Sequence, residues 1–279
     1  KTIIMNRQEL FELIKRKRSF LCVGLDSDIE KIPSHLLDAE DPVFEFNKEI
    51  IDNTYDLVIG YKPQLAYYEA VGFEGLEALY KTVDYIKNLP EKKLLIGDCK
   101  RSDIDSTSEA YAKAMFEFWG FDAVTIVPFF GTDGILPFAN FKDKGIFIVC
   151  KSSNKSGGEI QDFFSEKNNM TLFENIAKIS SKSNEHDNIC LVMGATYPTE
   201  LKIIRDKNPN LPFLIPGLGH QKGDLFEIIE NSIINDNPNI LINSARGIIY
   251  SSDDPKKFGI SAREKVLEIN NQINNLYLF

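Results

Sequence analysis

The stretch Lys93-Leu94-Leu95-Ile96-Gly97-Asp98-Cys99-Lys100 combines an unbroken apolar run with charged residues at its end. Continuous rather than alternating apolar character is typical of a strand in a parallel sheet, because helices cover both faces of such a sheet. Asp98 and Lys100 are two residues apart, so on a strand they project to one face and Cys99 to the other. The stretch therefore predicts a buried parallel strand that ends in a pair of opposite charges.

Seven more runs of this kind recur along the chain: Phe20–Asp26, Leu57–Pro63, Ala123–Pro128, Gly145–Ser152, Asn188–Thr196, Pro212–Gly217 and Ile240–Arg246. Segments with helical periodicity separate most of them: Val43–Asn53, Gly75–Asn88, Ser106–Phe118, Leu172–Lys182, Glu200–Asp206, Leu225–Asn231 and Ala262–Leu276. Eight strand–helix units in one chain favour an α/β fold of the (β/α)8 TIM-barrel type.

We expect one barrel domain over residues 1–279, with a helical segment at 1–19 and a C-terminal helix at 256–279. No linker divides the chain, and no second catalytic domain is expected within it. An open doubly wound sheet is the alternative architecture. It lacks support because Gly24-Leu25-Asp26-Ser27 stands where a dinucleotide fingerprint would follow the first strand.

Composition narrows the function. The 279 residues include 32 basic and 41 acidic side chains, a net charge of −9. This balance argues against nucleic acid and anionic membranes as partners, since both need a basic surface. No apolar run reaches the roughly 18 residues of a membrane helix. Cys22, Cys99, Cys150 and Cys190 are scattered in apolar runs, which indicates reduced thiols in a cytoplasmic protein, and no local metal site is visible.

Polar residues at strand ends are the candidate site, because barrel enzymes carry their active sites there. They are Asp26, Lys62, Asp98 with Lys100, Lys151-Ser152-Ser153, and Ser244 with Arg246. Lys62 and the Asp98–Lys100 pair would form a network of alternating charges in the barrel mouth. An ordinary ion pair on a loop is the alternative interpretation.

Two loops add to this set. The glycine-rich turn at 216–224 and Arg246 would together suit an anion, although a structural turn with a solvated Arg remains an alternative. The polar stretch 151–158 is as compatible with a mobile lid as with a plain surface loop.

Ser106 and Glu109 match a helix capping box, which leaves Asp103 and Thr107 free. Phe129, Phe130, Tyr67 and Tyr68 are expected to pack in the core or the wall of the site.

Asp98-x-Lys100-x-x-Asp103-Ile104-x-x-Thr107 resembles the signature of the orotidine 5′-phosphate decarboxylase family, and it is complete here. The resemblance extends to the segments at 24–26, 61–63, 151–154, 216–224 and 243–247 and is strongest to the longer branch of the family. Departures occur at His220 and Lys222, where Ala and Gly are usual, and at Lys155, where Pro is usual. The departures at His220 and Lys222 bear on the grip on phosphate and leave the charged motif intact.

The resemblance implies a homodimeric barrel that converts orotidine 5′-monophosphate to UMP and CO2 without a metal or organic cofactor. Lys62, Asp98, Lys100 and Asp103 would be the charged catalytic set, with Lys100 as proton donor to C6. Asp103 and Thr107 would reach into the neighbouring subunit's site. The resemblance also implies substrate-binding residues, which are Asp26 (with Lys62) for ribose, Ser152 for the pyrimidine, and Gly217, Gly219, Gln221 and Arg246 for phosphate.

Two other functions remain open on these residues. One is a Mg2+-dependent sugar-phosphate aldolase or decarboxylase of the same barrel superfamily, which would need a further carboxylate ligand. The other is a barrel that binds a phosphorylated ligand without turnover, in which the charged residues form only an ion-pair network.

Overall fold

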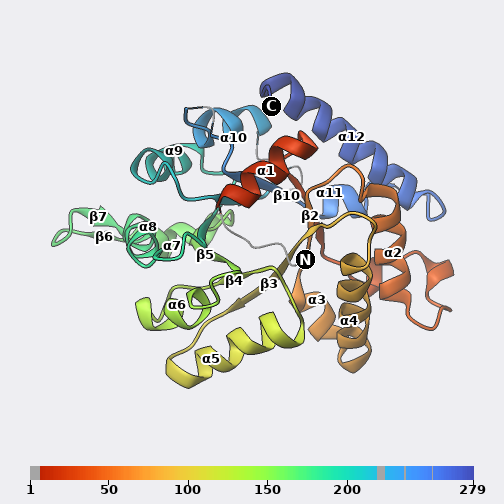
Figure 1. Ribbon diagram of the computed structural model, residues 1–279. Coiled ribbons are helices and arrows are strands. Elements are labelled where there is room, and N and C mark those ends of the chain that lie inside the picture. The colour runs from red at the N-terminus through yellow and green to blue at the C-terminus, as the bar shows by residue number, and fades with distance from the viewer. Residues whose placement is uncertain (1–6, 219–223, 236, 253) are drawn as a thin grey trace.

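Eight parallel strands close into a barrel in the spatial order β1-β10-β9-β8-β5-β4-β3-β2 (Figure 1). The structure is a computed structural model that describes residues 7–218, 224–235, 237–252 and 254–279. The barrel strands are β1 (Leu21–Leu25), β2 (Gly60–Pro63), β3 (Leu94–Arg101), β4 (Ala123–Ile126), β5 (Gly145–Lys151), β8 (Ile189–Met193), β9 (Phe213–Pro216) and β10 (Ile240–Ser244). Each lies within a predicted run or extends it by one residue, and the predicted (β/α)8 fold is confirmed.

Helices surround the barrel (Figure 1). The seven segments predicted as helical all contain one. The α-helices are α1 (Arg7–Lys17), α2 (Pro42–Thr54), α3 (Leu65–Val71), α4 (Phe73–Lys87), α5 (Asp105–Lys113), α6 (Thr132–Ala139), α7 (Gly158–Gln161), α8 (Leu172–Lys182), α9 (Pro198–Lys207), α10 (Leu225–Ser232), α11 (Arg246–Ile249) and α12 (Phe258–Leu276). A π-helical turn, η3 (Ala114–Phe118), extends α5. The 3-10 turns are η1 (Ile29–Lys31), η2 (Ser34–Leu36) and η4 (Lys155–Gly157).

Several of these elements were not expected from periodicity. Helices α3, α6, α7 and α11 are short, and α6 contains Pro137, which obscures a helical pattern. A small hairpin of β6 (Phe164–Ser165) and β7 (Met170–Thr171) lies between α7 and α8. It projects away from the barrel (Figure 1).

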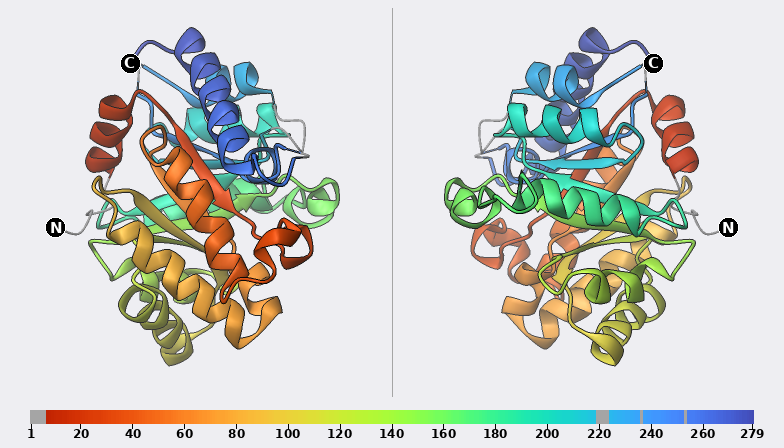
Figure 2. Two further views of the ribbon diagram at one scale, coloured as in Figure 1. Left: turned by 90° about the vertical axis from the view of Figure 1, so that its right-hand side faces the viewer. Right: turned by 90° about the vertical axis from the view of Figure 1, so that its left-hand side faces the viewer.

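The core follows from the continuous apolar strands. Every residue of β1, β4, β8 and β10 is buried, as expected when a barrel interior is packed on one side and helices cover the other. Helix α1 lies at the end of the barrel where the strands begin (Figure 2). Its Leu10, Leu13 and Ile14 are buried. Helix α12 packs against α2 on the outside. The opposite end of the barrel is thereby left for the strand-end side chains.

Three smaller expectations have mixed outcomes. The four cysteines are unpaired and buried, as predicted. The predicted capping box is wrong, because α5 begins two residues earlier than a Ser106 N-cap requires: Ile104 is the N-cap, no side chain caps it, and Ser106 lies inside the first turn. Tyr68 is buried, as expected. The expectation that Phe129 and Phe130 are packed is wrong, because these residues are 89% and 43% exposed. The two rings pack edge to face on each other in the segment after β4 rather than in the core.

Asp122 precedes β4, and its carboxylate accepts a hydrogen bond from the Leu95 N–H at 3.1 Å. Burial raises the pKa of Asp122 to about 6. A raised pKa means that the folded state favours the neutral acid, so this stabilisation is complete below the unfolded pKa near 4 and is lost as pH rises through 6. Asp122→Asn keeps an acceptor and stays neutral. We therefore expect its free energy of unfolding, relative to the parent, to rise between pH 4 and pH 8 in urea titrations.

Asp143→Asn, which removes a carboxylate from the exposed loop before β5, is the control. Parallel stability curves for the parent and Asp122→Asn over this pH range would contradict the burial argument.

Candidate active site

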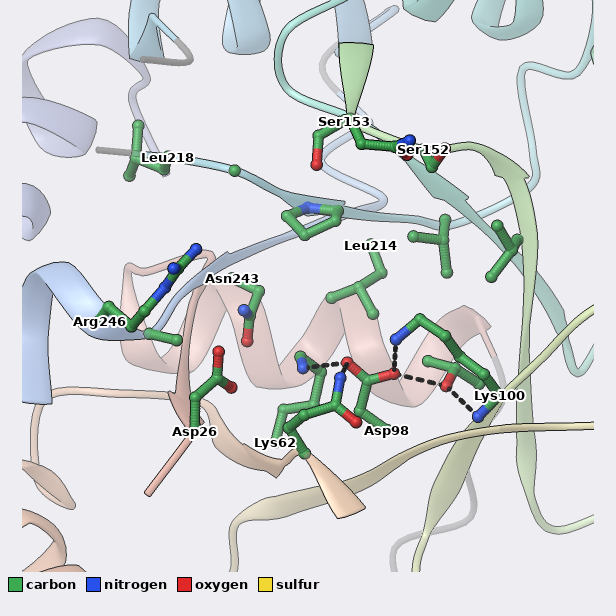
Figure 3. A pocket seen from close by; sticks show the side chains of 18 of the residues that line it. Asp26, Lys62, Asp98, Lys100, Ser152, Ser153, Leu214, Leu218, Asn243 and Arg246 are labelled. Carbon is green, nitrogen blue, oxygen red and sulfur yellow. Dashed lines mark hydrogen bonds and ion pairs between the residues drawn. The ribbon is translucent and has the colours of Figure 1, made fainter. Parts of the chain in front are cut away.

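A cavity of about 320 Å³ opens at the carboxyl ends of the strands. Seven of the expected catalytic and substrate-binding residues line it: Asp26, Lys62, Asp98, Lys100, Ser152, Gly217 and Arg246. The strand-end residue Ser153 lines it as well. They come from β2, β3 and the segments that follow β1, β5, β9 and β10, so the closed barrel brings together positions that are up to 220 residues apart. Figure 3 shows their side chains around this space.

Asp98 lies between two ammonium groups (Figure 3). Its Oδ2 is 2.5 Å from Lys62 Nζ, and its Oδ1 is 2.5 Å from Lys100 Nζ. Gln64 Nε2 donates to Oδ2 at 3.0 Å, and the Thr125 hydroxyl donates to Oδ1 at 2.7 Å. Four donors thus saturate one carboxylate, and the expected charge network of Lys62, Asp98 and Lys100 is present.

The charges of this network set its protonation. Burial alone would raise the pKa of Asp98, but the positive charges of Lys62 and Lys100 outweigh burial and hold the pKa well below its ordinary value. For Lys62, burial favours the neutral amine, yet the attraction of Asp98 and Asp26 raises the pKa above its ordinary value. Asp98 is therefore a carboxylate, and Lys62 an ammonium, throughout the neutral range.

Asp26 and Asn243 are placed differently. One carboxylate oxygen of Asp26 and the amide oxygen of Asn243 are buried without a hydrogen-bond partner. Burial raises the pKa of Asp26, and the nearby charge of Lys62 opposes this rise. Both side chains point toward the cavity in Figure 3. Because buried acceptors are normally satisfied, this pair provides two positions for hydroxyl or N–H donors of a ligand.

The segment after β5 is held by side chains of α7. Gln161 accepts from the Ser152 N–H at 3.0 Å and donates to the Ser152 hydroxyl at 2.7 Å. That hydroxyl also donates to Asn154 Oδ1 at 2.6 Å. Lys151, the charged residue that ends β5, is fully buried and pairs with Asp162 instead of entering the cavity.

Arg246 lies on the other side of the cavity from Lys100 (Figure 3), and Gly217 also lines the cavity. Arg246 begins α11, and Gly217 has a φ of 110°, a conformation that favours glycine. The predicted phosphate residues Gly219 and Gln221, and the departures at His220 and Lys222, lie outside the described residues.

Asp103 and Thr107 do not line this cavity. Asp103 accepts a hydrogen bond from the Ile104 N–H at 2.7 Å, and Thr107 is exposed on the first turns of α5. Within one chain, the structure therefore brings together three members of the expected catalytic set and leaves Asp103 apart.

Sequence reasoning missed Gln64, Thr125 and Asn243 as residues of the site. Gln64 follows the Tyr61-Lys62-Pro63 segment directly, and Asn243 begins the Asn243-Ser244-x-Arg246 segment, so both had a signal of position. Thr125 is an interior residue of an apolar strand and had none.

Two features are absent from the described part of the chain. No three or more His, Cys, Asp or Glu side chains there are grouped so that they could hold a metal ion. No helix there is long and apolar enough to cross a membrane.

Comparison with known proteins identifies the barrel. Residues 19–258 match the family described as orotidine 5′-phosphate decarboxylase / HUMPS. The chain belongs to this family. An orotidine 5′-phosphate decarboxylase of Bacteroides fragilis is 43% identical over 269 residues, which cover 96% of this chain and 97% of that protein.

Solved structures of the decarboxylase family agree in fold. The OMP decarboxylase of Leishmania donovani superposes with a TM-score of 0.80 at 31% identity, covering 96% of this chain and 98% of that one. The UMP synthase of the same organism gives a TM-score of 0.83 at 32% identity over 98% of this chain. This chain spans 56% of the length of that UMP synthase.

The buried Lys62–Asp98 pair yields a stability prediction. Lys62→Met leaves the carboxylate with one ammonium instead of two, and loss of one partner from a buried pair costs about 3 kcal/mol. The folded pKa of Asp98 lies well below its unfolded value near 4, so the stabilisation from its ionised form is present above pH 4 and is lost below it. We therefore expect the deficit of Lys62→Met in free energy of unfolding to be largest at neutral pH and to narrow as pH falls below about 4.

Lys48→Met breaks the half-exposed pair with Asp52 on α2 and is the matched control, with an expected cost below about 1 kcal/mol. A Lys62→Met variant as stable as this control would show that the pair does not hold the site together.

Proposed function

We propose that the protein decarboxylates orotidine 5′-monophosphate to UMP and CO2, the last step in making the pyrimidine nucleotide UMP. The observation that carries the proposal is the ionised Asp98 held between Lys62 and Lys100 in a strand-end cavity. Its support is membership of the decarboxylase family and the name of a relative that matches nearly the whole chain.

The chemistry fits these residues. When CO2 leaves, the bond from C6 to the carboxylate breaks and its electron pair stays on C6, where no conjugated group accepts it. The protein must therefore stabilise the carbanion electrostatically and supply a proton. We assign that proton to the Lys100 ammonium, which then becomes an amine and is reprotonated by solvent. Asp98 beside the substrate carboxylate would add a repulsion that is relieved as CO2 leaves.

The rest of the cavity suits the rest of the nucleotide. The unpaired oxygen of Asp26, with Lys62 nearby, is matched to ribose hydroxyls. Ser152 is proposed to contact the pyrimidine. Arg246, Gly217, Gly219 and Gln221 are proposed to grip the phosphate, and Arg246 lies on the side of the cavity away from Lys100 (Figure 3). Binding energy from this distant phosphate can hold the reacting end in its strained geometry.

We further propose a homodimer with shared sites. Asp103 and Thr107 lie outside the cavity of their own chain although they belong to the charged motif. The exposed Ile104 between them and the exposed Phe129 and Phe130 supply apolar surface near the ends of β3 and β4. In such a dimer, Asp103 of each chain would complete the charged set of its neighbour. The unpaired buried cysteines suit a cytoplasmic location.

The decisive test is an ultraviolet assay of the purified protein with orotidine 5′-monophosphate in the presence of EDTA. We expect the absorbance change of decarboxylation to persist after chelation, because residues of the protein itself fill all the proposed roles. Activity toward sugar phosphates that disappears with EDTA would instead support the Mg2+-dependent aldolase or decarboxylase. Tight UMP binding without turnover would support the binding barrel.

Lys100→Ala tests the proton donor. We expect turnover to fall by at least about 1,000-fold, since both the acid and its charge are lost, while UMP binding by calorimetry changes little. Lys31→Ala removes a half-exposed lysine that pairs with Asp28 outside the cavity, and it should keep normal turnover. Near-normal turnover in Lys100→Ala would refute the assignment.

Mixing variants tests the shared site. Asp98→Ala and Asp103→Ala homodimers should each be inactive. A hybrid dimer carries both lesions in one site and none in the other, so we expect the mixture to regain up to about a quarter of parental activity once subunits exchange. Inactive hybrids, verified by mass spectrometry, would contradict Asp103 acting across the interface.

A further inference from the structure

Thr125 is a buried residue of β4 that is 2% exposed and borders the cavity. From its contacts we infer that Thr125 is a positioning residue for the proposed proton donor: its hydroxyl fixes both the backbone of Lys100 and the carboxylate that holds the Lys100 ammonium. This inference deepens the proposed decarboxylation and rests on it for its catalytic consequence.

The Thr125 hydroxyl makes two hydrogen bonds in opposite senses. It donates to Asp98 Oδ1 at 2.7 Å, where an ionised carboxylate can only accept. It accepts from the backbone N–H of Lys100 at 3.1 Å. A hydroxyl offers one donor and two acceptor positions, so both hydrogen bonds can form at once. Val has a similar size but can neither donate nor accept a hydrogen bond.

The backbone of β3 needs this contact. The pairing of β3 with β4 advances four residues on β3, from Gly97 to Arg101, against two on β4, from Val124 to Ile126. Thr125 is the β4 residue opposite this bulge. Lys100, inside the bulge, has a φ of 46°, a left-handed conformation that is unfavourable for a residue with a side chain. The bulge displaces the Lys100 N–H from the regular ladder, and the Thr125 side chain supplies the acceptor.

The contacts close a ring. The Lys100 N–H bonds to the Thr125 hydroxyl, that hydroxyl bonds to Asp98 Oδ1, and the same Oδ1 lies 2.5 Å from Lys100 Nζ. The backbone N–H and the ammonium of Lys100 lie at the two ends of this long, half-exposed residue. Both are therefore held by the same buried pair of side chains, Thr125 and Asp98. Proton transfer to a carbon atom demands such placement, because a displacement of about 1 Å can cost roughly 100-fold in rate.

Gln64 is the second neutral donor to Asp98, but its contacts differ. It bonds to Oδ2, on the Lys62 side of the carboxylate, and its own oxygen faces the Ala66 N–H at the start of α3. Both neutral side chains bond the Asp98 carboxylate, but Thr125 also bonds the Lys100 backbone, whereas Gln64 faces the backbone of α3.

The test compares Thr125→Val, which keeps the shape and removes the hydroxyl, with Thr125→Ser, which keeps the hydroxyl. For Thr125→Val we expect kcat for orotidine 5′-monophosphate to fall about 10- to 100-fold with KM within about 3-fold, and for Thr125→Ser we expect kcat near the parental value. Thr54→Val is the matched control. It removes a buried hydroxyl of α2 that bonds the Ile50 carbonyl on the same helix and the Tyr61 hydroxyl on β2, so it should lower stability and leave kcat unchanged.

Crystal structures of the parent and Thr125→Val give a second readout that does not depend on turnover. We expect Lys100 in the variant to leave the left-handed region or its Nζ to move away from Asp98. Parental kcat in Thr125→Val, or an unchanged Lys100 conformation, overturns the inference. A parent that does not act on orotidine 5′-monophosphate refutes the proposed function, while the crystallographic comparison still decides the positioning. If Thr125→Val does not fold, Thr125→Ala provides both measurements.

Discussion

The ionised carboxylate of Asp98, held between the ammonium groups of Lys62 and Lys100, is the interaction on which the site depends. A buried carboxylate is tolerated only when it is paired and hydrogen-bonded, and Asp98 has four donors. The barrel supplies them from adjacent strands: the β2–β3 pairing sets Gln64 beside Asp98, and the β3–β4 pairing sets Thr125 there. The fold and the site therefore depend on each other, because a shift of either register would cost Asp98 at least one of its four donors.

Local charge placement also explains how an acidic protein can suit an anionic substrate. The chain carries a net charge of −9, yet Lys62, Lys100 and Arg246 all line one cavity. Not every strand-end cation belongs to this set: Lys151 is buried and neutralised by Asp162, and it secures the segment that carries Ser152. The cations that face the cavity and those that hold its walls are therefore separate groups.

Much of this could be predicted from sequence because the signals are local. Unbroken apolar runs identified the eight strands, and the charges at their ends identified Asp26, Lys62, Asp98, Lys100 and Arg246. Thr125 could not be found in this way, since its role arises from a bulge in the neighbouring strand. The predicted capping box at Ser106 is wrong for a related reason: the chain leaves β3 in a conformation that starts α5 two residues before that box would. In the proposed homodimer, the catalytic partners of Asp103 would belong to a second chain, which no pattern within one chain determines.

The central claim is the protonation state of the charged group, and neutron diffraction of a deuterium-exchanged crystal measures it directly. The account predicts no deuteron on either oxygen of Asp98, three deuterons on Lys62 Nζ, and one deuteron on the Thr125 hydroxyl directed at Asp98 Oδ1. A deuteron on the Asp98 carboxylate, or a neutral Lys62 amine, at neutral pH would contradict it.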